Sequence, residues 1–190
     1  MSKKPYVIGV TGGTCSGKTT LTGRLEESLS KGYNVKVFHM DAYFKRPSPT
    51  TIAPITRIEY FEHNHPDAFD LERLYNELDN ALEDESENKA DIVIIEGLFT
   101  LHLDHIRDLL DLKVFVDLES DERLVRRVKR FMGFGQTPEE ITSRYIDTVR
   151  FRHKELVEPT RWHADVVING TLDMNLGTDI LLKYIELMVK

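Results

Sequence analysis

The chain contains a single cysteine, Cys15, among its 190 residues. One cysteine excludes an internal disulfide and any metal site built from several cysteines. No apolar run approaches the roughly 18 residues that a membrane-spanning helix needs. The N-terminus also lacks the apolar core of a secretory signal peptide. We therefore expect a soluble, intracellular, cytoplasmic protein without a membrane partner.

The chain also has fewer basic than acidic residues. The sequence has 25 Lys and Arg against 32 Asp and Glu, which gives a formal net charge of −7. Proteins that bind nucleic acid in a general way do so through an excess of positive charge. The charge balance therefore argues against a nucleic-acid partner and leaves small molecules as the expected ligands.

Short apolar runs alternate with helical patterns along the chain. The runs predict five strands, at residues 6–10, 35–40, 91–96, 113–117 and 165–168. Periodic leucines, capping residues and turn residues predict five helices. The first follows the first strand and ends near residue 31, and the others span 71–82, 120–131, 138–156 and 175–190. This alternation predicts an α/β fold, a five-stranded parallel sheet doubly wound by helices, with residues 1–190 forming one domain.

Two segments interrupt this alternation. Residues 45–66 have no helical period and contain several prolines, so we expect a loop or hairpin, and long irregular segments in compact domains are usually functional. Gly133-Phe134-Gly135 precedes a helix start marked by Thr137-Pro138-Glu139-Glu140, a capping box with proline at the first helical position. A helix, a glycine-rich turn and a second helix are what a closing lid needs, so residues 130–140 are predicted to form a helical lid.

The segment from Gly12 to Thr19 has the pattern G-x-x-x-x-G-K-[ST] of a phosphate-binding loop, between a strand and a helix. Glycines allow backbone N–H groups to surround phosphates, and the helix N-terminus adds partial positive charge. Lys18 would contact the outer phosphates, and Thr19 would offer its hydroxyl to Mg²⁺. The residues expected to bind ATP are Gly12, Gly13, Thr14, Cys15, Ser16, Gly17, Lys18, Thr19 and Thr20. We therefore predict a P-loop NTPase fold.

Two acidic residues end predicted strands, where open α/β sheets bind their ligands. Glu96 follows the most hydrophobic strand, and Asp41 follows the second strand. Kinases need one group that neutralises phosphate charge and one that orients or deprotonates the attacking hydroxyl. One of the two carboxylates would then act through magnesium and the other on the substrate hydroxyl.

Arginines recur on one face of the helix predicted at 120–131. Arg123, Arg127 and Arg130 are spaced by four and three residues, and such a stripe is usually a solvated face. Because this helix leads into the predicted lid and a phosphate-binding loop is present, we favour the alternative that the stripe faces the triphosphate. His63, His65 and His102 lack metal-ligand spacing and are expected to be pocket or loop residues.

Several segments together resemble the uridine kinase (uridine–cytidine kinase) family, which is close to phosphoribulokinase. His65-Pro66-Asp67-Ala68-Phe69-Asp70 matches a string that is uncommon elsewhere. The other segments that carry the resemblance, in the family's order, are Gly9–Thr20, Met40–Lys45, Ile95–Gly97, Phe115–Asp117 with Arg126-Arg127, Glu158–Thr160 and Ala164–Ile168. The resemblance covers nearly the whole chain.

The resemblance implies ATP-dependent phosphorylation of the 5′-hydroxyl of a nucleoside, uridine or cytidine, by a protein that can form homo-oligomers. By this resemblance Asp41 would be the general base and Glu96 the metal-associated acid, beside Thr19. Arg127 would contact ribose and Arg130 the triphosphate. The substrate-binding residues implied are Asp41, Tyr43, Asn64, His65, His102, Arg127 and Arg144; the catalytic ones are Lys18, Asp41, Arg127 and Arg130.

The departures from the family concern residues that would bind the phosphate acceptor, not those that would bind ATP. Asn64 replaces an aspartate that grips ribose in the family, His102 replaces a tyrosine near the base, and Arg144 replaces a glutamine. The lid segment Gly133-Phe134-Gly135-Gln136 lacks both arginines that the family carries there. Two alternatives therefore stay open: a kinase for another riboside or a sugar phosphate, and a catalytically weak regulatory relative that binds nucleotide.

Overall fold

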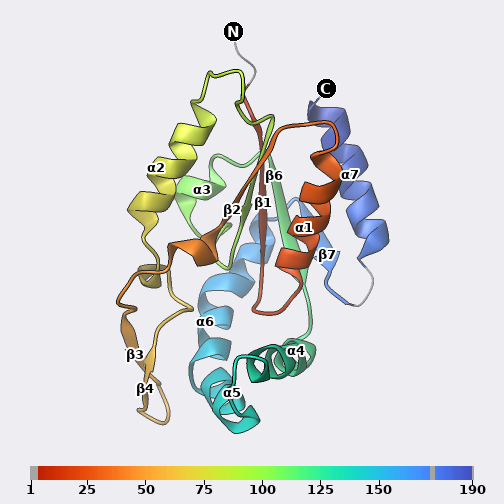
Figure 1. Cartoon of the computed structure of the whole chain (residues 1–190). Helices are drawn as coiled ribbons and strands as arrows, with labels where there is room; N and C mark the ends of the chain where they lie inside the picture. The colour runs from red at the N-terminus through yellow and green to blue at the C-terminus, as the bar shows by residue number, and fades with distance from the viewer. Residues whose placement is uncertain (1–3, 172–173, 190) are drawn as a thin grey trace.

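The computed structural model describes residues 4–171 and 174–189. Its centre is a five-stranded sheet in the order β2-β5-β1-β6-β7, in which every neighbouring pair is parallel (Figure 1). The strands are β1 (Tyr6–Gly12), β2 (Val35–His39), β5 (Ile92–Glu96), β6 (Leu112–Asp117) and β7 (Val166–Asn169). The predicted five-stranded parallel sheet is therefore confirmed, and the carboxyl ends of its strands meet at one edge.

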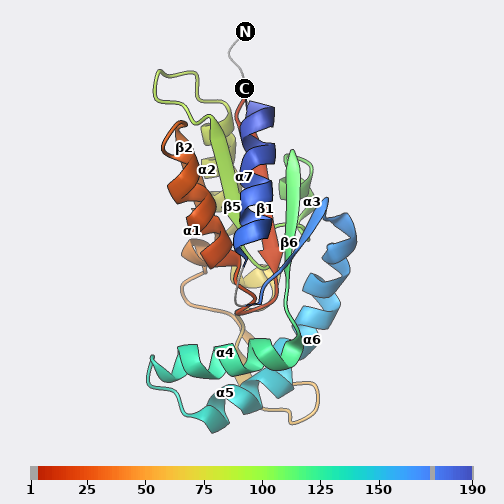
Figure 2. The ribbon, with the colours of Figure 1, turned by 90° about the vertical axis from the view of Figure 1, so that its right-hand side faces the viewer.

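Helices cover both faces of this sheet (Figure 2). α1 (Lys18–Leu29) and α7 (Asn175–Val189) lie on one face, and α2 (Leu71–Leu82) and α3 (Asp104–Arg107) lie on the other. Successive side chains of a strand point to opposite faces, so Ile92 and Ile94 pack on the α1 side while Val93 and Ile95 pack on the α2 side. This two-sided burial explains why the strands are unbroken apolar runs.

The helix α2 shows how local sequence and packing agree. The Asp70 carboxylate accepts a hydrogen bond from the backbone N–H of Arg73 at 3.1 Å, which caps the first turn. Leu74 and Leu78, four residues apart, are both fully buried against the sheet. The helix predicted at 71–82 is therefore confirmed. α3 was not expected, because its four residues are too few to show a period.

A second group of elements projects beyond the carboxyl edge of the sheet (Figure 1). A hairpin of β3 (Thr50–Ile52) and β4 (Glu59–Phe61) lies within the proline-rich segment 45–66. α4 (Ser120–Met132) and α5 (Pro138–Arg144) form the helix–turn–helix expected around residues 130–140, and the capping box of Thr137 and Glu140 is present. Both interruptions of the sequence pattern therefore lie on the side of the phosphate-binding loop.

The helix predicted at 138–156 is wrong in its detail. α5 ends at Arg144 and is followed by a wide π-helical turn (Tyr145–Val149), α6 (Arg150–Arg152), a second wide turn (His153–Val157) and a 3₁₀ helix (Glu158–His163). The Thr148 hydroxyl donates to the Arg144 carbonyl at 3.0 Å, which competes with the regular backbone bond. Wide turns of this kind are frequent at functional sites.

Smaller differences concern the ends of elements. The second strand stops at His39, one residue earlier than expected, and a 3₁₀ turn follows at Met40–Tyr43. A further 3₁₀ turn spans Pro66–Ala68. Within the described residues, no helix is long and apolar enough to span a bilayer.

Replacement of Leu78 by alanine should lower the free energy of unfolding by about 2–5 kcal/mol, because the side chain is 0% exposed and its removal leaves a cavity. Leu176→Ala is the matched control, since Leu176 is 74% exposed, and it should change stability by less than about 0.5 kcal/mol. Urea unfolding followed by circular dichroism measures both. Equal losses in the two variants would contradict the assignment of Leu78 to the core.

Candidate functional site

The segment Gly12–Thr19 forms a loop between β1 and α1. Gly12 and Gly17 have φ of +146° and +108°, a region that side chains disfavour. Gly17 begins α1 without a side-chain cap, which leaves the first N–H groups of the helix open to a phosphate. The Lys18 ammonium donates to the Gly13 carbonyl at 3.0 Å and is buried within the loop. The arrangement has the geometry of an anion-binding site.

The side chain of Arg123 packs against Gly13 of this loop. A Cβ atom on Gly13 would lie 2.6 Å from Nη1 of Arg123, so only glycine fits there without a shift. The Arg123 Nε–H donates to the Leu118 carbonyl at 3.0 Å, which fixes the guanidinium. Arg123 and Arg127 are both buried, whereas Arg130, on the same helix, is exposed. The solvated-face interpretation of the arginine stripe is therefore wrong for the first two.

Two carboxylates lie next to Lys18. Glu96, at the end of β5, is buried, and its Oε2 accepts from the Thr19 hydroxyl at 3.4 Å and lies 3.0 Å from Nδ1 of His39. Asp41 follows β2, the strand next to β5 in the sheet. Desolvation lowers the pKa of Lys18, and the charges of Glu96 and Asp41 oppose that shift. The charge states of Lys18, Glu96 and Asp41 are therefore coupled to one another.

The pKa of Asp41 is raised. The main cause is desolvation by the surrounding protein, although part of the Asp41 side chain is exposed to solvent. The charge of Lys18 opposes the shift, that of Glu96 adds to it, and that of Arg130 opposes it. A raised pKa makes the carboxylate a better proton acceptor. The charge of Arg130 also adds to the lowering of the pKa of Lys18.

Thr19 and Glu96 are the side chains suited to hold Mg²⁺. No group of three or more His, Cys, Asp or Glu in the described part of the chain could hold a metal ion alone. Mg²⁺ usually binds through one or two carboxylates and completes its octahedron with phosphate oxygens and water. A hydroxyl and a carboxylate 3.4 Å apart beside a phosphate-binding loop fit such a site.

Arg127 connects α4 with the phosphate-binding loop. Its Nη1 donates to the Thr14 hydroxyl at 3.0 Å, and its guanidinium lies 4.3 Å from the ring centre of Phe131. Burial lowers its pKa, and the buried Nε–H has no hydrogen-bond partner within residues 4–171 and 174–189. Buried N–H groups are seldom unpaired, so the guanidinium is suited to receive an oxygen of a ligand.

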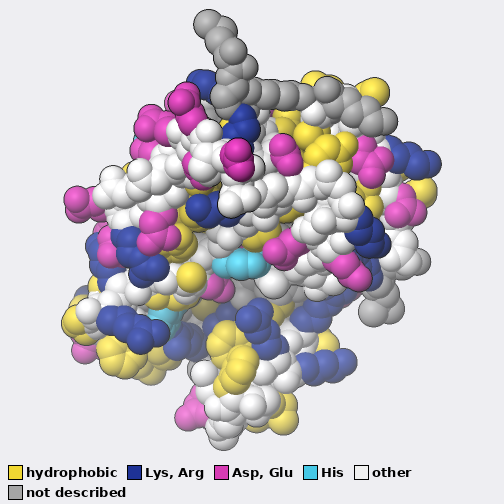
Figure 3. All heavy atoms as spheres, turned by 45° about the horizontal axis from the view of Figure 1, so that its top comes forward, with side chains coloured by type: hydrophobic (Ala, Val, Ile, Leu, Met, Phe, Trp, Pro, Cys, Tyr) yellow, Lys and Arg dark blue, Asp and Glu magenta, His cyan; other side chains and the backbone are white. Residues whose placement is uncertain are grey.

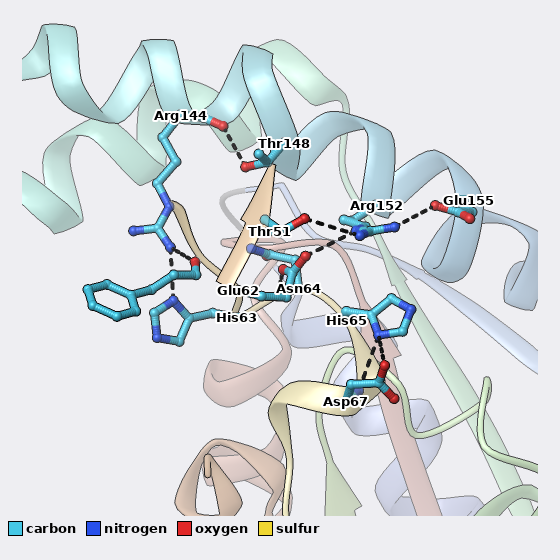
Figure 4. A network of polar contacts seen from close by, with 11 residues as sticks. Thr51, Glu62, His63, Asn64, His65, Asp67, Arg144, Thr148, Arg152 and Glu155 are labelled. Atoms are coloured by element: carbon cyan, nitrogen blue, oxygen red, sulfur yellow. Dashed lines mark hydrogen bonds and ion pairs between the residues drawn. The ribbon is translucent and has the colours of Figure 1, made fainter. Parts of the chain in front are cut away.

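Arg144, in the last turn of α5, binds the segment after the hairpin (Figure 4). Its Nη2 donates to the Phe61 carbonyl at 2.6 Å and lies 2.9 Å from Nδ1 of His63. Desolvation, followed by the charge of Arg144, lowers the pKa of His63. His63 is therefore favoured as a neutral acceptor of this hydrogen bond.

Arg152 and Glu62 form a second connection between the same segments (Figure 4). The Arg152 Nε–H donates to Oε2 of Glu62 at 3.1 Å, and its other nitrogens bind Glu155 at 3.1 Å and Thr51 at 3.4 Å. The other carboxylate oxygen of Glu62 accepts from the backbone N–H of Asn64 at 2.7 Å. Because Glu62 is buried, this pairing neutralises its charge and fixes the backbone of Asn64.

The third connection between these segments is made by the buried carboxylate of Asp147. Asp147 accepts hydrogen bonds from the hydroxyls of Thr56 at 2.9 Å and Tyr60 at 2.8 Å. Both hydroxyls belong to the hairpin segment, and Asp147 lies in the first wide turn after α5. The hairpin segment is therefore held against residues 144–155 at three points.

Three residues predicted to bind substrate have other contacts. The Tyr43 hydroxyl donates to Glu77 on α2 at 2.6 Å, so the side chain belongs to the core and is directed to α2. His65 accepts from the backbone N–H of Asp67 at 3.2 Å. His102 packs against the ring of Phe99, and burial lowers its pKa. None of these contacts is to the phosphate-binding loop.

Sequence reasoning missed Glu62, Arg152 and His153. His153 lines a cavity of about 10 Å³ together with Thr14 and Asn64. Its Nε2 lies 3.0 Å from Glu158, and burial followed by the charges of Arg123 and Lys18 lowers its pKa to about 4. The contact is thus a hydrogen bond from a neutral imidazole at pH 7.

A larger cavity, of about 910 Å³, lies at the opposite end of the sheet. It is lined near the starts of β1, β5 and β6 by residues such as Tyr6, Asp91 and Asp111. Acidic side chains gather at this end of the molecule, near the N-terminus (Figure 3). No residue of the phosphate-binding loop lines it. The converging polar groups described above, rather than cavity size, define the candidate site.

Comparison with known sequences identifies relatives. The sequence model of the phosphoribulokinase / uridine kinase family matches residues 77–176. Uridine kinases from Bacillus pumilus and Lactobacillus johnsonii are 30% and 31% identical, over 100% and 97% of this chain and 98% and 96% of the relatives. A uridine kinase from Lactococcus lactis subsp. lactis is 32% identical over 94% of this chain and 95% of the relative.

Solved structures share the fold. A protein described as a fructose transport system kinase, from Silicibacter sp. TM1040, has a TM-score of 0.66 at 20% identity and covers 87% of this chain and 90% of its own. A protein described as a possible uridine kinase, from Bacillus stearothermophilus, has a TM-score of 0.54 at 23% identity, with 88% and 90% covered. At these identities the likeness shows the architecture alone, and it agrees with the predicted P-loop α/β fold.

Acidification should destabilise the chain through His153. Its pKa is about 4 in the folded chain and about 6.5 when unfolded, so the unfolded state gains protons first. The stabilisation from the neutral imidazole is complete above about pH 6.5 and is lost as the pH falls towards 4. Urea unfolding at about pH 7.5 and about pH 4.5 should show a loss on the order of 3 kcal/mol more in the wild type than in His153→Phe. Equal losses would show that His153 is not held neutral by burial.

Proposed function

Because the chain belongs to the phosphoribulokinase / uridine kinase family, we propose that it transfers the γ-phosphoryl group of ATP to the 5′-hydroxyl of a nucleoside, with uridine and cytidine as the expected acceptors. One observation carries this proposal. Oε2 of Glu96, at the end of β5, lies 3.4 Å from the Thr19 hydroxyl in the phosphate-binding loop, and Asp41 follows β2, the neighbouring strand. This placement supports a site in which a group for the donor phosphates and a group for the acceptor hydroxyl lie at the same edge of the sheet.

The donor half consists of the residues Gly12 to Thr20. The open N–H groups of α1 and the loop backbone would bind the phosphates, with Lys18 reaching the outer ones. Thr19 and Glu96 would hold Mg²⁺, which neutralises charge on the phosphate oxygens when bound. Arg127, hydrogen-bonded to Thr14, and Arg130, one turn later on the same helix, would stabilise charge on the transferred group.

The acceptor half is centred on Asp41. Its raised pKa suits a carboxylate that takes the proton of the attacking 5′-hydroxyl as the new P–O bond forms. Asn64, held through its backbone by Glu62, would bind the sugar, with Arg127 beside it. His65, His102 and Arg144 would line the remainder of the acceptor pocket. The hairpin and the segment 144–155 would exclude water from the reaction.

A second acceptor class is favoured by one observation. Arg144 has no carboxylate within ion-pair distance among the described residues, and its Nε–H is buried without a partner. A guanidinium in this state suits an anionic oxygen. An acceptor that carries a phosphate, such as a sugar phosphate, would supply one.

Incubation with ATP, Mg²⁺ and a panel of nucleosides and sugar phosphates should reveal acceptor-dependent release of ADP, and we expect uridine and cytidine to give the highest kcat/KM. Arg144→Gln separates the two acceptor classes, because the loss of its charge should lower kcat/KM for a phosphorylated acceptor far more than kcat/KM for a neutral nucleoside. Binding of ATP without stimulation by any acceptor would contradict the kinase proposal and favour a regulatory role.

Asp41→Asn should lower kcat by roughly 100- to 10,000-fold, because the amide cannot accept the hydroxyl proton. The Kd for ATP, measured by calorimetry, should change little, since the phosphate-binding loop is intact. Asp108→Asn is the matched control, because Asp108 is exposed and lies by the large cavity at the opposite end of the sheet. Unchanged turnover in Asp41→Asn would show that another group takes the proton.

A further inference from the structure

His39 stands next to the acid that is suited to hold Mg²⁺. It is the last residue of β2, and its register partner on the neighbouring strand β5 is Glu96, the last residue of that strand. Because side chains alternate along a strand, both point to the face on which Val37 and Ile94 pack. That face is covered by α1 (Figure 2). The register of the sheet therefore places both side chains on the side of the helix that carries Thr19.

The imidazole of His39 is hydrogen-bonded to this acid. Its Nδ1 is 3.0 Å from Oε2 of Glu96, and the Thr19 hydroxyl donates to the same oxygen at 3.4 Å. An ionised carboxylate only accepts hydrogen bonds, so the hydrogen of the shorter contact is on Nδ1, whether or not the ring is charged. The shorter distance is typical of an N–H···O bond, whereas the longer one exceeds the usual range for two oxygens. His39 is therefore the firmer of the two restraints on Glu96.

The two oxygens of the Glu96 carboxylate differ in their surroundings. Both hydrogen bonds are to Oε2, and Oε1 has no hydrogen-bond partner within residues 4–171 and 174–189. The side chain is only 9% exposed. A carboxylate that is largely removed from water is costly unless its oxygens are paired. Oε1 therefore suits a cation, or a water molecule that is bound to one.

The orientation of a carboxylate matters for Mg²⁺ in particular. This ion demands nearly ideal octahedral geometry at short distances, so a side chain that rotates freely is a poor ligand for it. Glu96 has several rotatable bonds, and a donor fixed to one of its oxygens removes much of that freedom. Groups that hold a metal-binding side chain in place typically change metal affinity by about 10- to 100-fold. A contact of this size can be measured.

We propose that His39 is a positioning residue for Mg²⁺: its Nδ1–H holds Oε2 of Glu96 and leaves Oε1 for the metal or for one of its water molecules. The proposal rests on the proposed function and adds to it a residue that lies outside the motifs recognised in the sequence. No bond is made or broken at His39. Its effect is on how tightly the protein–ATP complex binds Mg²⁺.

The test measures metal binding rather than turnover. Calorimetry without an acceptor gives the Kd for ATP in EDTA and at a series of buffered Mg²⁺ concentrations, and together these give the Kd of the protein–ATP complex for Mg²⁺. His39→Leu should raise this Kd by about 10-fold or more, because the carboxylate loses its firmer restraint. The Kd for ATP in EDTA should stay within about twofold, since the phosphate-binding loop is unchanged.

Two polar variants separate the hydrogen bond from the polarity of the side chain. His39→Asn places its amide nitrogen at the position of Nδ1 and should keep the Kd for Mg²⁺ close to that of the wild type. His39→Gln places its amide one bond further out, near the position of Nε2, and should bind Mg²⁺ as weakly as His39→Leu. These two variants also decide the question if His39→Leu does not fold, which thermal melting reports.

His105→Leu is the matched control. Nε2 of His105 lies 3.6 Å from Oδ1 of Asp79, and its ring packs on Tyr75, so it is another partly exposed histidine beside a carboxylate. Neither of these partners belongs to the candidate site, and the variant should leave the Kd for Mg²⁺ unchanged.

Three results would each overturn the proposal. They are an unchanged Kd for Mg²⁺ in folded His39→Leu, an equally weakened Kd in His39→Asn, and ATP binding that Mg²⁺ does not strengthen in the wild type. Because the experiment uses no acceptor, absence of turnover with every nucleoside would refute the proposed acceptor alone. Absence of ATP binding would refute the proposed function itself, and this inference with it.

Discussion

The burial of one ammonium group organises the functional end of this molecule. Lys18 is enclosed by the loop that it helps to shape, with its charge hydrogen-bonded to the Gly13 carbonyl. A buried charge is costly unless other charges compensate it. Asp41 and Glu96 supply that compensation from the ends of adjoining strands, and they raise the pKa that desolvation lowers. The parallel order of the sheet makes this possible, because it brings the carboxyl ends of β1, β2 and β5 to one edge.

The acceptor side depends on a different constraint, the attachment of the hairpin to the irregular helix that follows α5. Arg144, Asp147 and Arg152 lie within nine positions of one another in the chain and reach the hairpin segment at three points. Wide turns rotate successive side chains differently from a regular α-helix. The same irregularity buries His153 beside Thr14 and Asn64. A small departure from a regular helix thereby brings residues from three distant parts of the chain to one cavity.

Much of the fold could be predicted from the sequence because its signals are local. The unbroken apolar run before Glu96 and the capping residues Asp70 and Thr137 predicted a strand and two helix starts that the structure confirms. The partners of Glu62 could not be predicted in this way. Its buried carboxylate is paired with Arg152, 90 residues later, and no local pattern relates the two. The contact of Tyr43 with Glu77 escaped prediction for the same reason.

The sequence by itself determined the family, the phosphate-binding loop and the alternation of strands and helices, since these depend on short motifs and on hydrophobic period. Only the tertiary structure decided which arginines are buried and which histidines have lowered pKa values. It also decided which side chains hold the hairpin segment. Burial and ionisation depend on neighbours that come from distant parts of the chain, and the energy of a charge is set by its whole surroundings. A motif can therefore name the residues expected to bind phosphate, whereas the packed structure decides which polar groups surround them.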